Sequence, residues 1–142
     1  MAEADFHASS SRGKALSLAD FQGKVPVVLA FVGPLDPGGA EVADYDRHHV
    51  DFGRERVQLL LVAHADGADV RAVPFSGHDL PVLADPHDEV LAAYSDGEPA
   101  SGFAAILDKQ GRLVERLPLA GAEALLARVR ELGDRLHADE QG

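Results

Sequence analysis

Three residues with metal-binding side chains, Asp44, His48 and Asp51, recur at spacings of four and three residues. In an α-helix these spacings place side chains on one face, so two carboxylates and an imidazole would lie together there. Both groups bind Zn²⁺, which makes this face a candidate metal site. Such a face is more often simply solvated, and no second segment supplies ligands at a spacing typical of metal sites. We therefore expect no metal and no other cofactor, and keep these three residues as the metal-ligand candidates.

A second candidate is the segment Asp36-Pro37-Gly38-Gly39, which separates an apolar run from an amphipathic pattern. Asp followed by Pro is a favourable pair at a helix start, because the carboxylate caps the first amides and proline fits the first helical position. This structural interpretation is preferred. The functional alternative is that Asp36 and the amides of Gly38 and Gly39 bind a small ligand at the head of that helix.

Other histidines are considered in the same way. His49 falls on the apolar face of the amphipathic pattern and is expected to be packed and hydrogen-bonded. His64 and Asp66 follow a predicted strand, at a position where α/β proteins often place functional residues. An acid–base pair of Asp36 with a nearby histidine therefore remains an alternative to a purely structural role.

Several function classes are excluded by what the sequence lacks. The 142 residues contain no cysteine, and the only sulfur atom is that of Met1. We find no Ser-His-Asp pattern, nucleophile elbow or phosphate-binding loop. A net charge of -11 without a basic stripe argues against nucleic acid as a partner. With no signal peptide and no apolar run long enough to span a membrane, we expect a soluble cytoplasmic protein that has no membrane contact.

The first half of the chain predicts a parallel β-α-β unit. Residues 25–32 form an apolar run rich in β-branched side chains, which is typical of a strand covered on both faces. Apolar spacings of three, four and three then predict one helix face, made of Val42, Tyr45, His49 and Phe52. Residues 57–63 form a second apolar run, so we expect a right-handed parallel crossover.

The second half predicts further elements in the order helix, strand, helix, hairpin and helix. Their expected positions are a helix over 66–73, an extended segment over 80–83, a helix capped by Asp85 and ending at Tyr94, strands over 103–107 and 113–117, and a final helix that buries Leu125, Val129, Leu132 and Leu136. The turn at 108–111 joins the two strands of the hairpin. On the final helix, Glu131 and Arg135 are spaced for an ion pair.

These elements predict an α/β fold, namely a three-layer α/β/α sandwich with a mixed central sheet. We expect one domain over residues 14–138. Residues 1–13 are small and polar and are expected to be a flexible N-terminal segment, and residues 139–142 are expected to be a C-terminal tail. Within the domain, residues 15–24 are expected to form a short element at the edge.

Four segments carry a resemblance to a known family: LSLADFQGKVPVVLAF, VQLLLVAHAD, DLPVLADPHDEVLAAY and AAILDKQGRLVERL. In this order they resemble the thioredoxin-like fold. In detail they are similar to its peroxiredoxin-like branch, the redoxin or alkyl hydroperoxide reductase/thiol-specific antioxidant group. The resemblance covers nearly the whole chain from Leu16 to Leu136.

The resemblance implies where the active site of such a protein would be. Thioredoxin-like members carry Trp-Cys-x-x-Cys and peroxiredoxins carry Thr-x-x-Cys, and both motifs match LDPGG at residues 35–39. Asp36 then stands at the first cysteine or the threonine, and Gly39 at the second or peroxidatic cysteine. A register shifted by one residue would instead put Gly38 at the cysteine. Gly102 stands where relatives place an arginine or a cis-proline.

Peroxide reduction and disulfide reduction by this fold need a thiolate nucleophile, so the absence of cysteine excludes both activities. We therefore expect a non-catalytic pseudoenzyme in a redox or antioxidant context. It would bind a protein partner or a small ligand at the vestigial site, which we define as Asp36, Pro37, Gly38, Gly39 and Gly102. The resemblance also leaves a homodimer open. The alternative is a thiol-independent enzyme that uses a histidine-bound metal or an Asp/His acid–base pair.

Overall fold

The computed structural model describes residues 7–9, 15–17, 20–21, 23–33, 44–45, 47–64, 82–85, 89–94, 102–118 and 121–136. The strands are β1 (His7–Ser9), β2 (Ala15–Ser17), β3 (Val27–Gly33), β4 (Gln58–Ala63), β5 (Val82–Ala84), β6 (Phe103–Leu107) and β7 (Leu113–Pro118). The helices are α2 (His49–Arg54), α4 (Glu89–Tyr94), α5 (Ala122–Glu131) and α6 (Gly133–Leu136).

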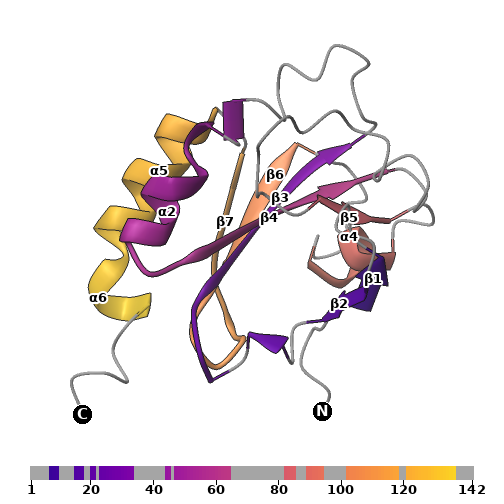
Figure 1. Ribbon diagram of the computed structural model, residues 1–142, viewed down its shortest axis with the longest axis horizontal. Coiled ribbons are helices and arrows are strands. Elements are labelled where there is room, and N and C mark those ends of the chain that lie inside the picture. Colours follow the sequence, from indigo (N-terminus) through magenta and orange to yellow (C-terminus); the bar gives the residue numbers. More distant parts are fainter. Residues whose placement is uncertain are drawn as a thin grey trace.

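The central sheet has five strands in the order β5-β4-β3-β6-β7 (Figure 1). Strand β4 is parallel to both β3 and β5, whereas β6 is antiparallel to β3 and β7. The predicted mixed sheet is therefore confirmed. The β-α-β crossover and the late hairpin also lie where the sequence placed them.

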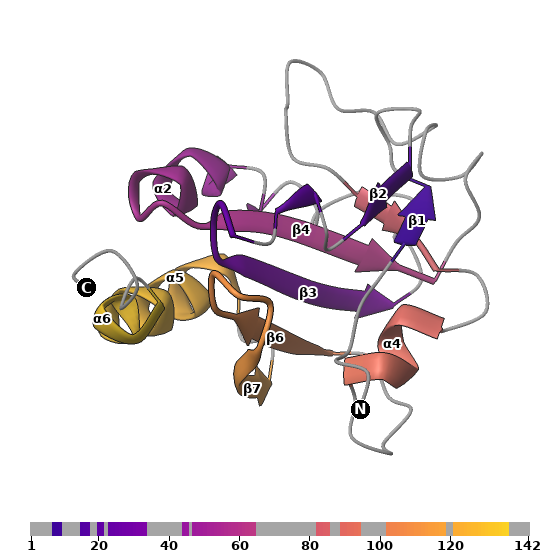
Figure 2. The ribbon, with the colours of Figure 1, turned by 90° about the horizontal axis from the view of Figure 1, so that it is seen from below.

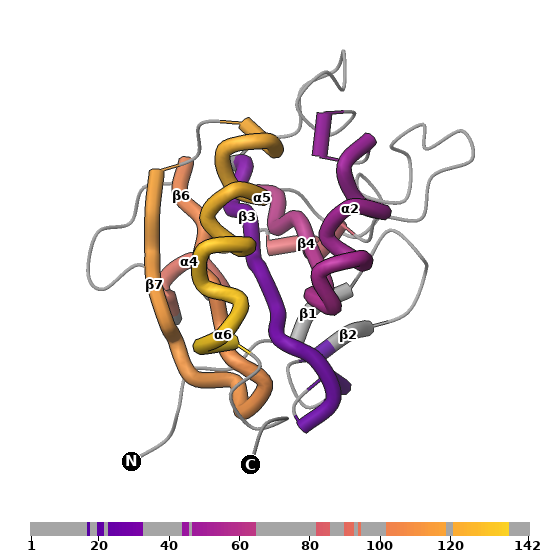
Figure 3. The backbone as a smooth tube through the Cα atoms, turned by 90° about the vertical axis from the view of Figure 1, so that its left-hand side faces the viewer, coloured from indigo at the N-terminus to yellow at the C-terminus, as the bar shows by residue number. Residues whose placement is uncertain are grey.

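Helices cover both faces of this sheet, as Figure 2 shows from below. Successive residues of β3 alternate between two hydrophobic clusters. Val28 and Ala30 pack on the face of α2, α5 and α6, while Leu29 and Phe31 pack on the face of α4. Figure 3 shows α2 side by side with α5 and α6 on the first of these faces. The three-layer α/β/α architecture follows directly from this alternation, because each buried face of a strand needs its own cover.

The amphipathic pattern of the final helix placed the buried residues correctly but not the helix boundary. Leu125, Val129, Leu132 and Leu136 are all buried, yet the helix is interrupted at Leu132, between α5 and α6. The expected Glu131–Arg135 pair is consequently wrong, and Glu131 instead pairs with Arg128 at 3.1 Å. Among the described residues, no helix is both long and apolar enough to cross a bilayer.

The N-terminal region contains a pairing that the sequence analysis did not anticipate. Residues 1–13 were expected to be a flexible segment, whereas His7–Ser9 form β1 and pair antiparallel with β2. Strand β1 also contacts β5. The expected helix over 66–73 and the tail at 139–142 lie outside the described residues.

Asp85 links three elements on the α4 side of the sheet. It follows β5 directly, its backbone N–H donates to the Ala63 carbonyl at 2.9 Å, and the residue is only 4% exposed. Its two carboxylate oxygens accept hydrogen bonds from the amides of Val90 and Leu91, at 3.1 and 3.0 Å. The predicted capping role is thus correct, although the carboxylate reaches amides five and six residues ahead.

We predict that Asp85→Ala lowers the free energy of unfolding by about 2–3 kcal/mol, because two buried amides lose a charged acceptor. Asp85→Asn should cost less, since its single amide oxygen can still accept a hydrogen bond. Urea unfolding followed by circular dichroism measures both changes. Asp134→Ala, which removes an exposed carboxylate from α6, is the control and should leave stability unchanged within about 0.5 kcal/mol. Equal stability of Asp85→Ala and the parent chain would contradict the assignment.

Candidate functional site

The end of β3 leads into the vestigial site. Phe31 pairs with Val62 in β4, and the register then shifts so that Gly33 pairs with Ala63. Irregularities of this kind re-aim a chain at the rim of a sheet and are frequent beside active sites. Residues 34–43, which include Asp36, Pro37, Gly38 and Gly39, lie outside the described residues. The expectations about these four positions therefore stay predictions.

Gly102 is the described member of the vestigial site, and it lies beside the end of β3. Its backbone N–H donates to the Phe31 carbonyl at 2.8 Å. Its φ is +90°, a conformation that L-residues rarely adopt, and a Cβ added there would meet no atom within 4 Å. Room for a side chain exists, but the backbone disfavours one. Proline is excluded more strongly, because its ring fixes φ near -65°.

Three aromatic rings lie close to Gly102. Phe103 stacks on Phe31 with ring centroids 4.5 Å apart, and Tyr94 lies 6.3 Å from Phe31. Phe31 and Tyr94 are buried, whereas Phe103 is half-buried. The three rings come from β3, α4 and β6, so their separation in the sequence gave no sign that they would meet.

Asp44, the first of the metal-ligand candidates, caps a distant helix. One carboxylate oxygen accepts a hydrogen bond from the Ala122 amide at 3.0 Å, and the other accepts one from Arg47 at 2.9 Å. Helix α5 starts after Gly121, which has no side chain that could cap the helix. Asp44 therefore provides the acceptor for the first amide of α5, that of Ala122. The Ala122 amide, followed by Arg47 and His48, holds the pKa of Asp44 below its ordinary value against the opposing effect of burial.

His48 and Asp51 have protein contacts of their own. The Nδ1 of His48 lies 2.9 Å from the Asp44 carbonyl, and its Nε2 lies 3.7 Å from a Glu123 carboxylate oxygen. Asp51 pairs with Arg54 at 3.5 Å. In the described part of the chain, no group of three or more histidine or acidic side chains is arranged to hold a metal ion. The three candidates thus share a helical segment but are not brought together as a ligand set.

The two other histidines considered in the sequence, His49 and His64, are among the described residues. His49 begins α2 and is half-buried rather than fully packed, while His64 follows β4 and is exposed. His64 is at the same edge of the sheet as Gly33, because β3 and β4 are parallel and end together. Asp66 lies outside the described residues.

The described residues at the end of β3 are mostly backbone and apolar groups. The sequence has no thiol, and both oxygens of Asp44 are engaged. What lies beside the end of β3 is an exposed glycine backbone next to a half-buried aromatic ring. Such a surface can contact an apolar group, and the exposed His64 lies at the same edge of the sheet.

Solved structures of other proteins superpose on this chain over most of their length. Thioredoxin peroxidase I from Plasmodium yoelii superposes with a TM-score of 0.79 at 22% identity, covering 99% of this chain and 91% of that one. The mitochondrial 2-Cys peroxiredoxin from Plasmodium falciparum gives 0.74 at 16% identity, covering 97% and 94%. The fold is thioredoxin-like.

A further solved structure with this thioredoxin-like fold is the exposed lipoprotein thioredoxin of Streptococcus pneumoniae strain TIGR4. Its TM-score is 0.69 at 29% identity, and the alignment covers 91% of this chain and all of that one. No family model and no curated protein matches the sequence. The likeness is therefore one of fold, shared with peroxiredoxins and thioredoxins.

We predict that Asp44→Asn lowers the free energy of unfolding at neutral pH by about 1 kcal/mol, because the cap of α5 loses its charge. Since the folded pKa of Asp44 is lowered, its contribution is present above the unfolded pKa and is lost as the pH falls through the folded value. The difference between the two proteins should thus shrink below about pH 4.

Urea unfolding at a series of pH values measures this difference. Asp51→Asn is the matched control, because among the described residues that carboxylate pairs with exposed Arg54, and its effect should stay within about 0.5 kcal/mol. A pH-independent difference for Asp44→Asn would contradict the capping role.

Proposed function

We propose that this protein is a peroxiredoxin-like protein without thiol catalysis, which binds a protein partner or a small ligand at the vestigial site. The observation that carries the proposal is the combination of a thioredoxin-like fold with a sequence that contains no cysteine. Reduction of a peroxide or a disulfide by this fold transfers electrons through a thiolate, and no other residue type replaces that chemistry.

The conformation of Gly102 supports the view that several positions of the site have changed, and not only the one that would carry the catalytic sulfur. An arginine at this position would assist a thiolate, but φ at +90° makes any L-residue there unfavourable by about 1–2 kcal/mol. This backbone therefore disfavours the side chain that the catalytic pattern would need.

The surface beside Gly102 supports binding as the retained role. Gly102 is exposed and has no side chain to cover this surface, and the half-buried Phe103 adds an apolar contact. Aromatic side chains are enriched at the surfaces through which proteins bind their partners. We further propose that the protein acts in the cytoplasm, in a redox or antioxidant context.

The second interpretation, a thiol-independent enzyme, finds less support. Asp44 uses both carboxylate oxygens on protein donors, and the Nδ1 of His48 contacts a backbone carbonyl. A metal ion at these residues would have to displace the cap of α5.

We predict that the purified, untagged chain consumes neither hydrogen peroxide nor an alkyl hydroperoxide faster than buffer does, with dithiothreitol or reduced thioredoxin as the electron donor. The physical reason is the missing sulfur nucleophile. Repeating the assay after chelation and after addition of Zn²⁺ tests the alternative enzyme. Robust turnover by the untreated chain would refute the proposal, and turnover only with metal would support the alternative.

A stepwise restoration tests whether the site was rebuilt. We predict that Gly39→Cys alone is a slow peroxidase, because the Asp36 carboxylate raises the pKa of the new thiol. Adding Asp36→Thr should increase the rate by about tenfold for each pKa unit recovered. Adding Gly102→Arg should increase it again, but at a cost of about 1–2 kcal/mol in stability, from φ at +90°.

Stopped-flow peroxide kinetics and urea unfolding measure the two effects separately. Placing the cysteine at position 38 in a parallel series covers the other register. A fast peroxidase from the single change would show that the site had merely lost its sulfur.

A further inference from the structure

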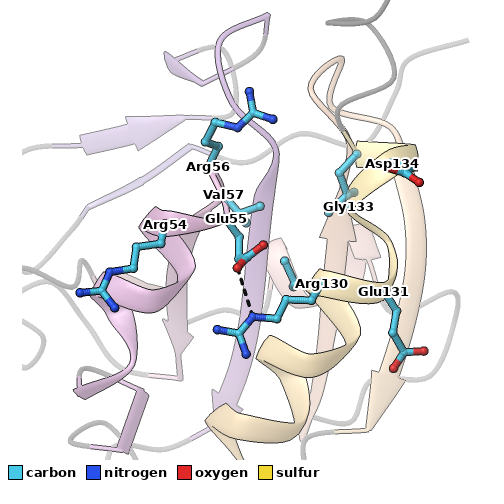
Figure 4. Close-up of a pocket in the computed structure, with 10 residues that line it drawn as sticks. Arg54, Glu55, Arg56, Val57, Arg130, Glu131, Gly133 and Asp134 are labelled. Atoms are coloured by element: carbon cyan, nitrogen blue, oxygen red, sulfur yellow. Dashed lines mark hydrogen bonds and ion pairs between the residues drawn. The ribbon is translucent and has the colours of Figure 1, made fainter.

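We draw no further inference here: the strongest candidate, the groove between the α2–β4 connection and the α5–α6 helices (Figure 4), carries nothing because its lining is mostly polar, its apolar side chains Val57, Val129 and Leu136 are buried, and its exposed Arg130 is already paired with Glu55.

Discussion

The fold depends on the burial of β3 on both faces. Residues 27–30 of this strand have no exposed surface, and Phe31 is 1% exposed. A strand buried in this way cannot leave water on either side, so the chain must supply helices to both faces of the sheet. The crossover through α2 covers one face together with α5 and α6, and α4 contributes to the other. The same burial holds the end of β3 in place, and residues 36–39 of the vestigial site follow this strand in the sequence.

The burial of β3 on both faces also explains which elements could be predicted well from the sequence. A continuous apolar run, a spacing of three and four residues, and a turn with Asp and Gly are local patterns that report local structure. They placed β3, β4, the β6–β7 hairpin and the buried face of the last helix. The break at Leu132 was missed, because a glycine inside an apolar pattern shifts helix stability by only about 1 kcal/mol, and packing decides the outcome.

Long-range contacts were beyond such patterns. The bond between Asp44 and the Ala122 amide joins residues 78 positions apart, and the stacking of Phe31 on Phe103 depends on the antiparallel pairing of β3 and β6. The sequence made Asp44 a metal-ligand candidate because spacing along one helix is visible while a partner on another helix is not. The positive φ of Gly102 was equally hidden, since glycine adopts many conformations without a signature.

A fold of this kind and the chemistry that it carries are separable in general. The described core is built from apolar side chains of the sheet and its helices, and Gly102 is not part of it.

The link from Asp44 to α5 has a consequence for how the chain reaches its final shape. Helix α5 is ten residues long, which is too short to be stable alone in water. Its amino end stays without a partner until the segment around Asp44, made much earlier during synthesis, has docked against the sheet. The carboxy-terminal helices should consequently be the last to become protected from hydrogen exchange and the first to open.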